Sequence, residues 1–306
     1  MTHTATVQPH PCSARHALLR TLWYFELFQH PLTAAELERF SNCPKSELRD
    51  LEEILQELVA EGAVFQFGSY FQTKNIPAWV ERRKGFNQRA DLILPTARKM
   101  AGLISAFPFV RAVFVSGSLS KHCMAPDSDV DFFIITTSRR LWLARTLLVF
   151  FKKVVLFNSH RYFCINYFVD TEHLEIEEKN LFTATETVTL LPLYGRHWYE
   201  HFYQANAWAW AQFPNLPARP TEQVPEGQRS FLKKTWEFLL SSPPGNWLDL
   251  WSMRFTVWYW RRKFRDMDND TFDRALKSRR HVSKHHPLYF QKKILDAFAE
   301  RVARES

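Results

Sequence analysis

The chain has 306 residues, of which 46% are hydrophobic and 24% are charged, and this composition excludes a disordered or fibrous protein. The length allows two or three compact units. The four cysteines lie far apart and form no C-x-x-C pair, which argues against a disulfide framework or a zinc finger and predicts a cytoplasmic protein. The strongest apolar run, residues 141–157, contains three basic residues, so the sequence predicts no membrane-spanning helix.

The excess of positive charge lies in one part of the chain. The net charge is +8, and residues 254–294 alone hold twelve lysines and arginines against four aspartates. Because the remaining residues are balanced in charge, we expect any anionic partner to bind this C-terminal part. At the other end, residues 1–13 lack the apolar core of a secretory signal and are predicted to form a disordered arm.

Residues 14–75 have the element order of a winged helix. Their apolar spacing and turn residues predict three helices and then a short hairpin, the wing. The predicted elements are helices over 14–28, 34–40 and 47–60 and a hairpin over 63–73. Thr33 and Glu36 are spaced as a capping box for the second helix, and Ser46 is expected to cap the third.

The charges of the third helix argue against DNA binding. Residues 45–61 carry six acidic side chains and two basic ones, a net charge of −4. A helix with that charge would be repelled by the phosphates that line the major groove. Duplex DNA is therefore a disfavoured partner, and we interpret 14–75 as a protein-interaction or packing module.

Residues 76–106 and 107–195 are predicted to form connecting helices and a central core. In the connecting segment, a helix begins after Pro77, Pro95 breaks it, and a second helix covers 96–106. In the core, the expected strands are 110–116, 130–136 and 162–169, and the expected helices are 139–151 and 184–191. The alternation predicts an α+β fold with a small mixed sheet and helices on one side.

The most informative pattern is Gly117-Ser118, followed after ten residues by Asp129-Val130-Asp131. Carboxylates at positions i and i+2 of a strand lie on one face, roughly 7 Å apart along it. Such a pair can hold one or two Mg²⁺ ions. The Gly-Ser turn offers backbone N–H groups and a hydroxyl to a phosphate. Together, these parts predict a site for a nucleoside triphosphate.

The pattern resembles the motif of the nucleotidyltransferase (polymerase-β-like) superfamily, in which an apolar residue, Gly, and Gly or Ser precede Asp-x-Asp by a similar gap. The resemblance covers residues 111–195 and implies a nucleotidyltransferase core. It implies that Asp129 and Asp131 are catalytic metal ligands for two Mg²⁺ ions. It also implies that Gly117 and Ser118 hold the terminal phosphates of the nucleotide. Lys121 either adds positive charge to the triphosphate or is a solvated turn residue.

The superfamily usually adds a third carboxylate from a neighbouring strand, often the base that activates the acceptor. The strand predicted here places Asn166 and Asp170 on the same face, roughly 13 Å apart along it, so only one can meet the metal ions. Asp170 would complete a catalytic and metal-binding triad with Asp129 and Asp131. Asn166 would instead supply a neutral amide and weaken both metal affinity and general-base capacity. We slightly favour Asp170.

Residues 196–306 are predicted to form a mostly helical, basic module that packs on the core. Within it, residues 246–265 contain seven aromatic side chains, with the polar residues clustered on one side. A helix that is apolar over most of its circumference is normally buried, so core packing is the favoured interpretation. A helix lying on a membrane surface and a site for single-stranded nucleic acid are the alternatives, and the membrane is not favoured.

These patterns lead to two functional hypotheses. The first is an ATP-binding, magnesium-dependent nucleotidyltransferase that moves a nucleoside monophosphate from a nucleoside triphosphate to a small molecule, a protein side chain or an RNA end. The second is a catalytically weak nucleotide sensor or interaction protein that keeps the same pocket. The acidic third helix and Asn166 favour the second hypothesis. A DNA-binding regulator is a third class, which the −4 charge disfavours.

Overall fold

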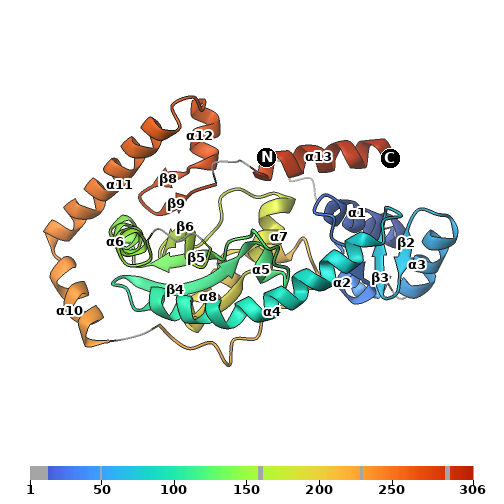
Figure 1. Ribbon diagram of the computed structural model, residues 1–306, viewed down its shortest axis with the longest axis horizontal. Coiled ribbons are helices and arrows are strands. Elements are labelled where there is room, and N and C mark those ends of the chain that lie inside the picture. Colours follow the sequence, from blue (N-terminus) through green and yellow to red (C-terminus); the bar gives the residue numbers. More distant parts are fainter. Residues whose placement is uncertain (1–12, 49, 158–160, 228–229, 287–289, 306) are drawn as a thin grey trace, which may run out of the picture. The chain divides into compact units, whose positions relative to one another are not determined.

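The computed structural model describes residues 13–48, 50–157, 161–227, 230–286 and 290–305. Apart from Ser13, the arm expected over residues 1–13 therefore lies outside the described residues. The protein combines helices with two sheets, one of them mixed, and belongs to the α+β class (Figure 1). It divides into two compact units. Unit 1 is Met1–Lys84, Trp210–Pro217 and Ile294–Ser306, and unit 2 is Gly85–Ala209 and Ala218–Lys293.

Unit 1 combines helices with an antiparallel sheet in the order β1-β3-β2. Its elements are α1 (Ala14–Glu26), β1 (Leu32–Thr33), α2 (Ala34–Phe40), α3 (Leu51–Ala60), β2 (Phe65–Phe67), β3 (Tyr70–Gln72) and, from Ile294 onward, α13 (Phe290–Glu305). The expected capping box is confirmed, because Thr33 N donates to Glu36 Oε2 at 2.9 Å and Glu36 N donates to Thr33 Oγ1 at 3.3 Å. The expected hairpin is also confirmed, with β1 as an additional strand.

The third helix of unit 1 begins later than the sequence predicts. A 3-10 turn covers Lys45–Glu47, and α3 begins only at Leu51, without a cap from Ser46. Asn215 gives a physical reason. Its side-chain oxygen accepts a hydrogen bond from Lys45 N at 2.8 Å, and its amide donates to two carbonyl oxygens earlier in the chain, both at 2.8 Å. These tertiary bonds hold the segment before α3 against its local helix propensity.

The connecting segment contains one long helix, α4 (Ala78–Ser105), so the predicted break at Pro95 is wrong. Proline inside a helix costs about 3 kcal/mol. Residues on both sides of it nevertheless belong to one hydrophobic core, and burial of this common face offsets that cost. The buried positions are Ala90, Ala97, Ala101 and Ile104. The boundary between the two units falls within α4, between Lys84 and Gly85.

Unit 2 is built on a mixed sheet in the order β7-β4-β5-β6-β9-β8. Its strands are β4 (Val110–Ser116), β5 (Asp131–Thr136), β6 (Cys164–Asp170), β7 (Leu191–Tyr194), β8 (Ser278–Arg279) and β9 (Val282–Lys284). Strands β5 and β6 are parallel, and the other neighbouring pairs are antiparallel. The sequence predicts the three central strands within a few residues. It does not predict β7, nor the pair β8 and β9, which lies far beyond the expected end of the core at residue 195.

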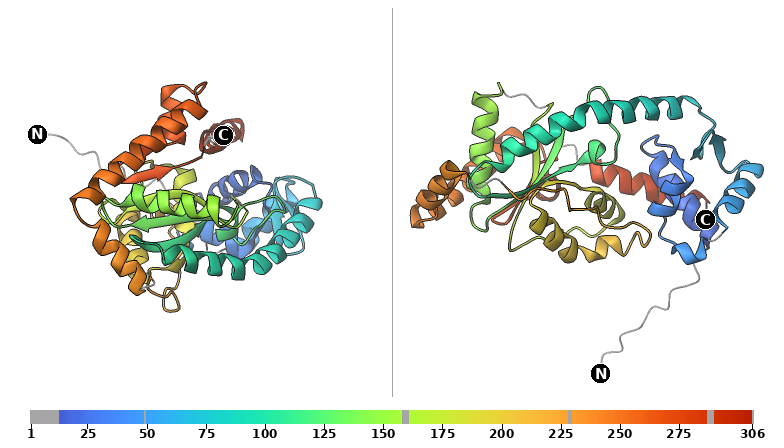
Figure 2. Two further views of the ribbon diagram at one scale, coloured as in Figure 1. Left: turned by 60° about the vertical axis from the view of Figure 1, so that its left-hand side comes forward. Right: turned by 90° about the horizontal axis from the view of Figure 1, so that it is seen from below.

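Helices cover both faces of this sheet, so the expectation of helices on one side is wrong. Besides α4, the helices between β4 and β9 are α5 (Gly117–Ser120), α6 (Leu141–Val154), α7 (Leu181–Thr189), α8 (Arg196–Ala205), α9 (Ala207–Trp210), α10 (Phe231–Leu240), α11 (Pro243–Lys263) and α12 (Asn269–Ala275). Phe132 and Ile134 of β5 share one core with residues of α4, α6, α11 and α12. Phe133, the residue between them, packs with Tyr199 and Phe202 of α8 on the other face. Helices are visible on both sides of the sheet in Figure 2 (right).

The pair α10 and α11 is joined to the rest of unit 2 by polar side chains. Arg140 donates to the carbonyl oxygens of Leu240 and Ser241 at 3.0 and 2.8 Å, where α10 ends. Asp249 of α11 is fully buried and accepts a hydrogen bond from Leu143 N at 2.9 Å, in the first turn of α6. Helix α6 has no capping side chain of its own, so Asp249 satisfies N–H groups that the helix leaves unpaired.

The aromatic helix α11 is oriented opposite to the favoured expectation of core packing. Its buried residues are Gly245, Asp249, Ser252, Thr256 and Trp260. Most of its aromatic side chains are exposed, with Trp247 at 66%, Trp251 at 51% and Trp258 at 56%. The small and polar stripe faces α6, because Asp249 and Trp260 contact it. The aromatic side therefore faces away from the core of unit 2.

Candidate functional site

The two halves of the Gly-Ser/Asp-x-Asp motif lie side by side on the central strands of unit 2. Strand β4 ends at Ser116, and β5 begins at Asp131, its direct antiparallel partner. Gly117 and Ser118 follow at once in the short helix α5 (Figure 1). The antiparallel pairing thus brings the start of β5 against the end of β4. The ten residues between Ser118 and Asp129 form most of the connection between the two strands.

Gly117 is required by the close approach of Asp131. Its φ is +66°, in the left-handed region that favours glycine. A Cβ atom at this position would lie 2.7 Å from Asp131 Oδ2, closer than such atoms pack. The aspartate side chain therefore occupies the space that any other residue at 117 would fill. This contact explains why the pattern has glycine at the turn.

Asn166, and not Asp170, lies beside Asp131. Asn166 Nδ2 donates a hydrogen bond to Asp131 Oδ1 at 2.5 Å. The pairing of β5 with β6 sets Asp131 opposite Cys164 and Thr136 opposite Asp170, so Asp170 lies at the far end of the strand. The expectation that Asp170 completes the triad is therefore corrected.

Asp170 has a structural role at that far end. Its Oδ1 accepts from the backbone N–H groups of Glu172 and His173, both at 3.0 Å, and lies 2.8 Å from His173 Nδ1. The carboxylate is 2% exposed. It closes the turn after β6, as aspartates commonly do when they bond to backbone groups two and three residues ahead.

The environment of Asp131 disfavours its negative charge. Burial is the largest cause, and the neighbouring charges of Asp129 and Glu186 add to it, so the pKa of Asp131 rises to about 7. A hydrogen bond with Cys164 and the positive charge of Lys121 act in the opposite direction. Asp129 lies two residues before Asp131 and outside β5, so the expectation of two carboxylates on one strand holds for Asp131 alone, although the charge of Asp129 still raises the pKa of Asp131. The two carboxylates therefore form one electrostatic site.

Lys121 lies in the same turn but already has a partner. Its Nζ donates to Gly117 O at 3.0 Å and to Glu186 Oε1 at 2.8 Å. The solvated alternative for Lys121 is therefore wrong, because the side chain is 19% exposed and paired. The ammonium group lies at the turn, and its two described bonds leave one of its three N–H donors for a phosphate.

Sequence reasoning missed three residues of this site. Glu186 of α7 pairs with Lys121, and Cys164 at the start of β6 bonds to Asn166 Oδ1 at 3.1 Å. Lys152 of α6 is buried, which lowers its pKa, and the charges of Cys164 and Asp129 act against that effect. The available signal was a lysine near the end of a strongly apolar predicted helix.

The donor set fits one Mg²⁺ ion. Within the described ranges, no group of three His, Cys, Asp or Glu side chains is arranged to hold a metal. Asp129 and Asp131 nevertheless supply two hard oxygen donors, and Mg²⁺ is commonly held by one or two carboxylates together with water and substrate phosphates. The side chain that β6 places against Asp131 is the amide of Asn166 and not a carboxylate. The two Mg²⁺ ions that the sequence predicts would need a third carboxylate ligand, which β6 does not supply.

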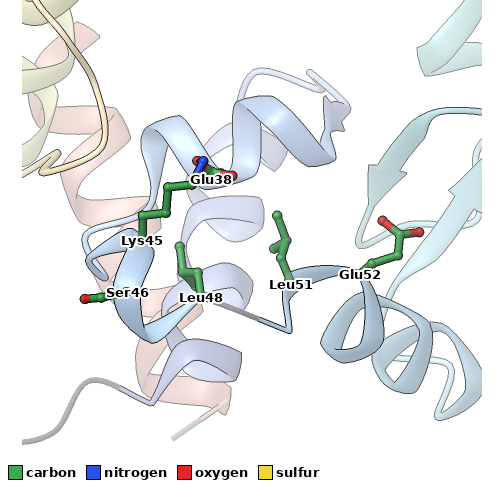
Figure 3. A pocket seen from close by; sticks show the side chains of 6 residues that line it. All are labelled: Glu38, Lys45, Ser46, Leu48, Leu51 and Glu52. Carbon is green, nitrogen blue, oxygen red and sulfur yellow. The ribbon is translucent and has the colours of Figure 1, made fainter.

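A separate pocket of about 600 Å³ lies in unit 1 (Figure 3). It is lined by Glu38, Lys45, Ser46, Leu48, Leu51 and Glu52. Lys45 Nζ and Glu38 Oε1 form an ion pair at 2.7 Å in it. None of these residues belongs to the site that the sequence predicts.

Two further observations bear on the class of protein. Among the helices in the described part of the chain, none has both the length and the apolar character that a membrane crossing requires. The chain matches no protein-family model, no curated protein and no solved structure.

Proposed function

We propose that unit 2 binds a nucleoside triphosphate with Mg²⁺ and transfers its nucleoside monophosphate to an acceptor, as the resemblance to the nucleotidyltransferase (polymerase-β-like) superfamily implies. The observation that carries this proposal is the packing of Asp131 against Gly117, in the space of a missing Cβ. This contact joins the carboxylate and the Gly-Ser turn in one site. Carboxylates beside such a turn are the parts that nucleotidyl transfer needs.

Asp129 and Asp131 would hold the ion, and Mg²⁺, when bound, would supply positive charge at the reacting phosphate. The backbone at Gly117 and Ser118 would hold the terminal phosphates. In the transfer, the acceptor oxygen forms a bond to the α-phosphorus, the bond between the α-phosphorus and the bridging oxygen breaks, and pyrophosphate leaves. Lys121, whose Nζ bonds to Gly117 O, lies close enough to the turn to offset charge on that leaving group.

Asn166 restricts the acceptor that this site can use. An amide cannot take the proton of an acceptor hydroxyl as a third carboxylate can. An acceptor phosphate is already ionised at neutral pH and needs no general base. The hydrogen bond from Asn166 to Asp131 therefore favours phosphorylated acceptors over alcohols.

A nucleotide sensor is the second candidate, and the same residue favours it. An amide in place of the third carboxylate weakens metal binding and removes the base, so a pocket of this kind can retain nucleotide without turning it over. In that case the triphosphate is bound with Mg²⁺ and recovered intact.

The test uses nucleoside triphosphates labelled at the α-phosphate, with Mg²⁺ and separate pools of phosphorylated and hydroxyl acceptors. The wild type is compared with the double variant Asp129→Asn/Asp131→Asn and with Asp127→Asn, a matched control in the same loop. We expect transfer of label to the phosphorylated pool by the wild type and the control only. Metal-dependent binding without transfer would establish the sensor. The absence of both nucleotide binding and transfer would refute both candidates.

A further inference from the structure

Helix α11 has an inverted distribution of side chains. A helix at the surface of a globular protein normally buries its apolar side and exposes its polar side. Here the buried stripe consists of small and polar residues, apart from Trp260, and the exposed side carries Trp247, Trp251, Phe255 and Trp258. We call these four residues the aromatic face. Each is at least half exposed, at 51–66%.

The aromatic face is ordered, and the neighbouring helix α10 is also apolar at its surface. The rings of Trp251 and Phe255 are stacked at 5.4 Å, and Phe255 and Trp258 follow at 5.8 Å. Helix α10, which contacts α11, adds large exposed apolar side chains. These are Phe231, Leu232, Trp236, Phe238 and Leu239. An exposed apolar surface of this extent marks an interaction site.

The charged side chains that α11 itself places beside the aromatic face are basic. Arg254 and Arg262 are exposed, and Arg262 lies 6.0 Å from the ring of Trp258. The helical spacing of positions 247, 251, 254, 258 and 262 puts both arginines on the side of the tryptophans. Asp249, the only acidic residue of α11, is fully buried on the opposite side. The partner of this face must therefore accept both aromatic rings and positive charge.

We propose that α10 and α11 form a surface that binds an anionic lipid bilayer, with α11 lying in the interface. Tryptophan and tyrosine side chains prefer the headgroup level of a membrane, and exposed arginines are attracted to anionic headgroups. This proposal does not depend on the nucleotide site. It reverses the expectation from sequence, which did not favour a membrane partner.

Two other partners fit the surface less well. A symmetric dimer would set the aromatic face of one copy against that of another, and the arginines on both would repel each other. Single-stranded nucleic acid stacks its bases on aromatic rings, but the exposed leucines of α10 offer no stacking surface. Aliphatic side chains beside aromatic rings and arginines instead match an interface between hydrocarbon and anionic headgroups.

The test is co-sedimentation of the full chain with vesicles of phosphatidylcholine that contain roughly 30% phosphatidylserine, and with vesicles of phosphatidylcholine alone. We expect binding to the anionic vesicles that weakens as salt increases. The double variant Trp251→Ser/Trp258→Ser and the charge reversal Arg254→Glu/Arg262→Glu should each weaken binding by about tenfold or more. Leu92→Ser is the matched control, because Leu92 is 77% exposed on α4, outside the surface, and its loss should leave binding unchanged.

These variants replace exposed side chains, so circular dichroism and the melting temperature should stay at their wild-type values and exclude unfolding as the cause. The proposal would be overturned if both double variants bound the anionic vesicles as strongly as the wild type does. It would also be overturned if the wild type did not bind vesicles. Self-association lost in the tryptophan variant, without vesicle binding, would assign the surface to a second copy. Salt-sensitive binding of an oligothymidine that the tryptophan variant loses, without vesicle binding, would assign the surface to nucleic acid.

Discussion

Replacing Gly117 with alanine tests the geometry of the candidate site most directly. Alanine at the observed φ of +66° costs about 1–2 kcal/mol, because the left-handed region is unfavourable for residues with a Cβ. The new Cβ would lie 2.7 Å from Asp131 Oδ2, so the carboxylate must move. Above the pKa of Asp131, where its carboxyl group is ionised, that movement disrupts the hydrogen bond from Asn166, which as a bond to a charged group contributes about 1.5–3 kcal/mol. Alanine recovers about 0.4–1 kcal/mol by restricting the unfolded chain, which leaves a net loss of about 2–4 kcal/mol.

Two other glycines separate the causes of this loss. Gly68 has a φ of +61°, and a Cβ atom added to it would meet nothing within 4 Å, so Gly68→Ala carries the backbone strain alone and should cost about 1 kcal/mol. Gly85 lies in α4 with open space around it, and Gly85→Ala should be neutral or stabilising by about 0.4–1 kcal/mol. The difference between Gly117→Ala and Gly68→Ala measures the collision with Asp131.

The assay combines denaturant unfolding with the increase in melting temperature that ATP and Mg²⁺ together produce. We expect the wild type, Gly68→Ala and Gly85→Ala to show that increase, and Gly117→Ala to lose it, because Asp131 has left its position. A stability loss in Gly117→Ala no greater than in Gly68→Ala, together with a full response to ATP and Mg²⁺, would refute the reasoning.

Three further predictions concern other parts of unit 2. Asn166→Asp places a carboxylate against Asp131, so it should lower the melting temperature without metal and enlarge the stabilisation by Mg²⁺; equal responses to Mg²⁺ in both proteins would contradict this. Asp249→Ala leaves N–H groups at the start of α6 unpaired and should reduce the free energy of unfolding by about 2–4 kcal/mol in denaturant titrations, whereas Asp249→Asn, which keeps an acceptor oxygen, should lose less. The ammonium of Lys233 is buried against the carbonyl oxygens of Ser105 and Val110, and burial lowers its pKa to about 8. The unfolded chain keeps that proton up to about pH 10.5, whereas the folded protein loses it above about pH 8. The wild type should therefore gain stability relative to Lys233→Met between about pH 8 and 10.5, by up to about 3 kcal/mol. Parallel pH profiles of stability for the two proteins would show that the pKa is not lowered.

The part of the site that the sequence could predict is the part that depends on neighbours along the chain. Gly117, Ser118, Asp129 and Asp131 lie at the ends of two adjacent antiparallel strands, so strand lengths and a short connection suffice to bring them together. The choice between Asn166 and Asp170 depends instead on the register of β6 against β5. That register contains an irregularity between Ile165 and Tyr167, and periodicity alone does not reveal it.

The fold shows the same division between local and distant causes. The capping box of α2 needs only Thr33 and Glu36, and it was predictable. The continuity of α4 through Pro95 depends on a core that other segments complete, and the late start of α3 depends on Asn215. The orientation of α11 was missed for a related reason. Six of its residues are aromatic, but its buried stripe contains Asp249, whose partner on α6 lies more than a hundred residues away in the chain.

The position of β9 in the sheet has a consequence for synthesis of the chain. Strand β6, which carries Asn166, pairs on one side with β5 and on the other with β9, and His285 N donates to Asn166 O at 2.9 Å. A ribosome makes residues 282–285 more than a hundred residues after β6. Until then, one edge of β6 presents unpaired backbone groups, which are a template for association with other chains. Ribosome-bound or truncated chains that end before residue 282 should therefore aggregate, or recruit chaperones, more readily than the full chain does.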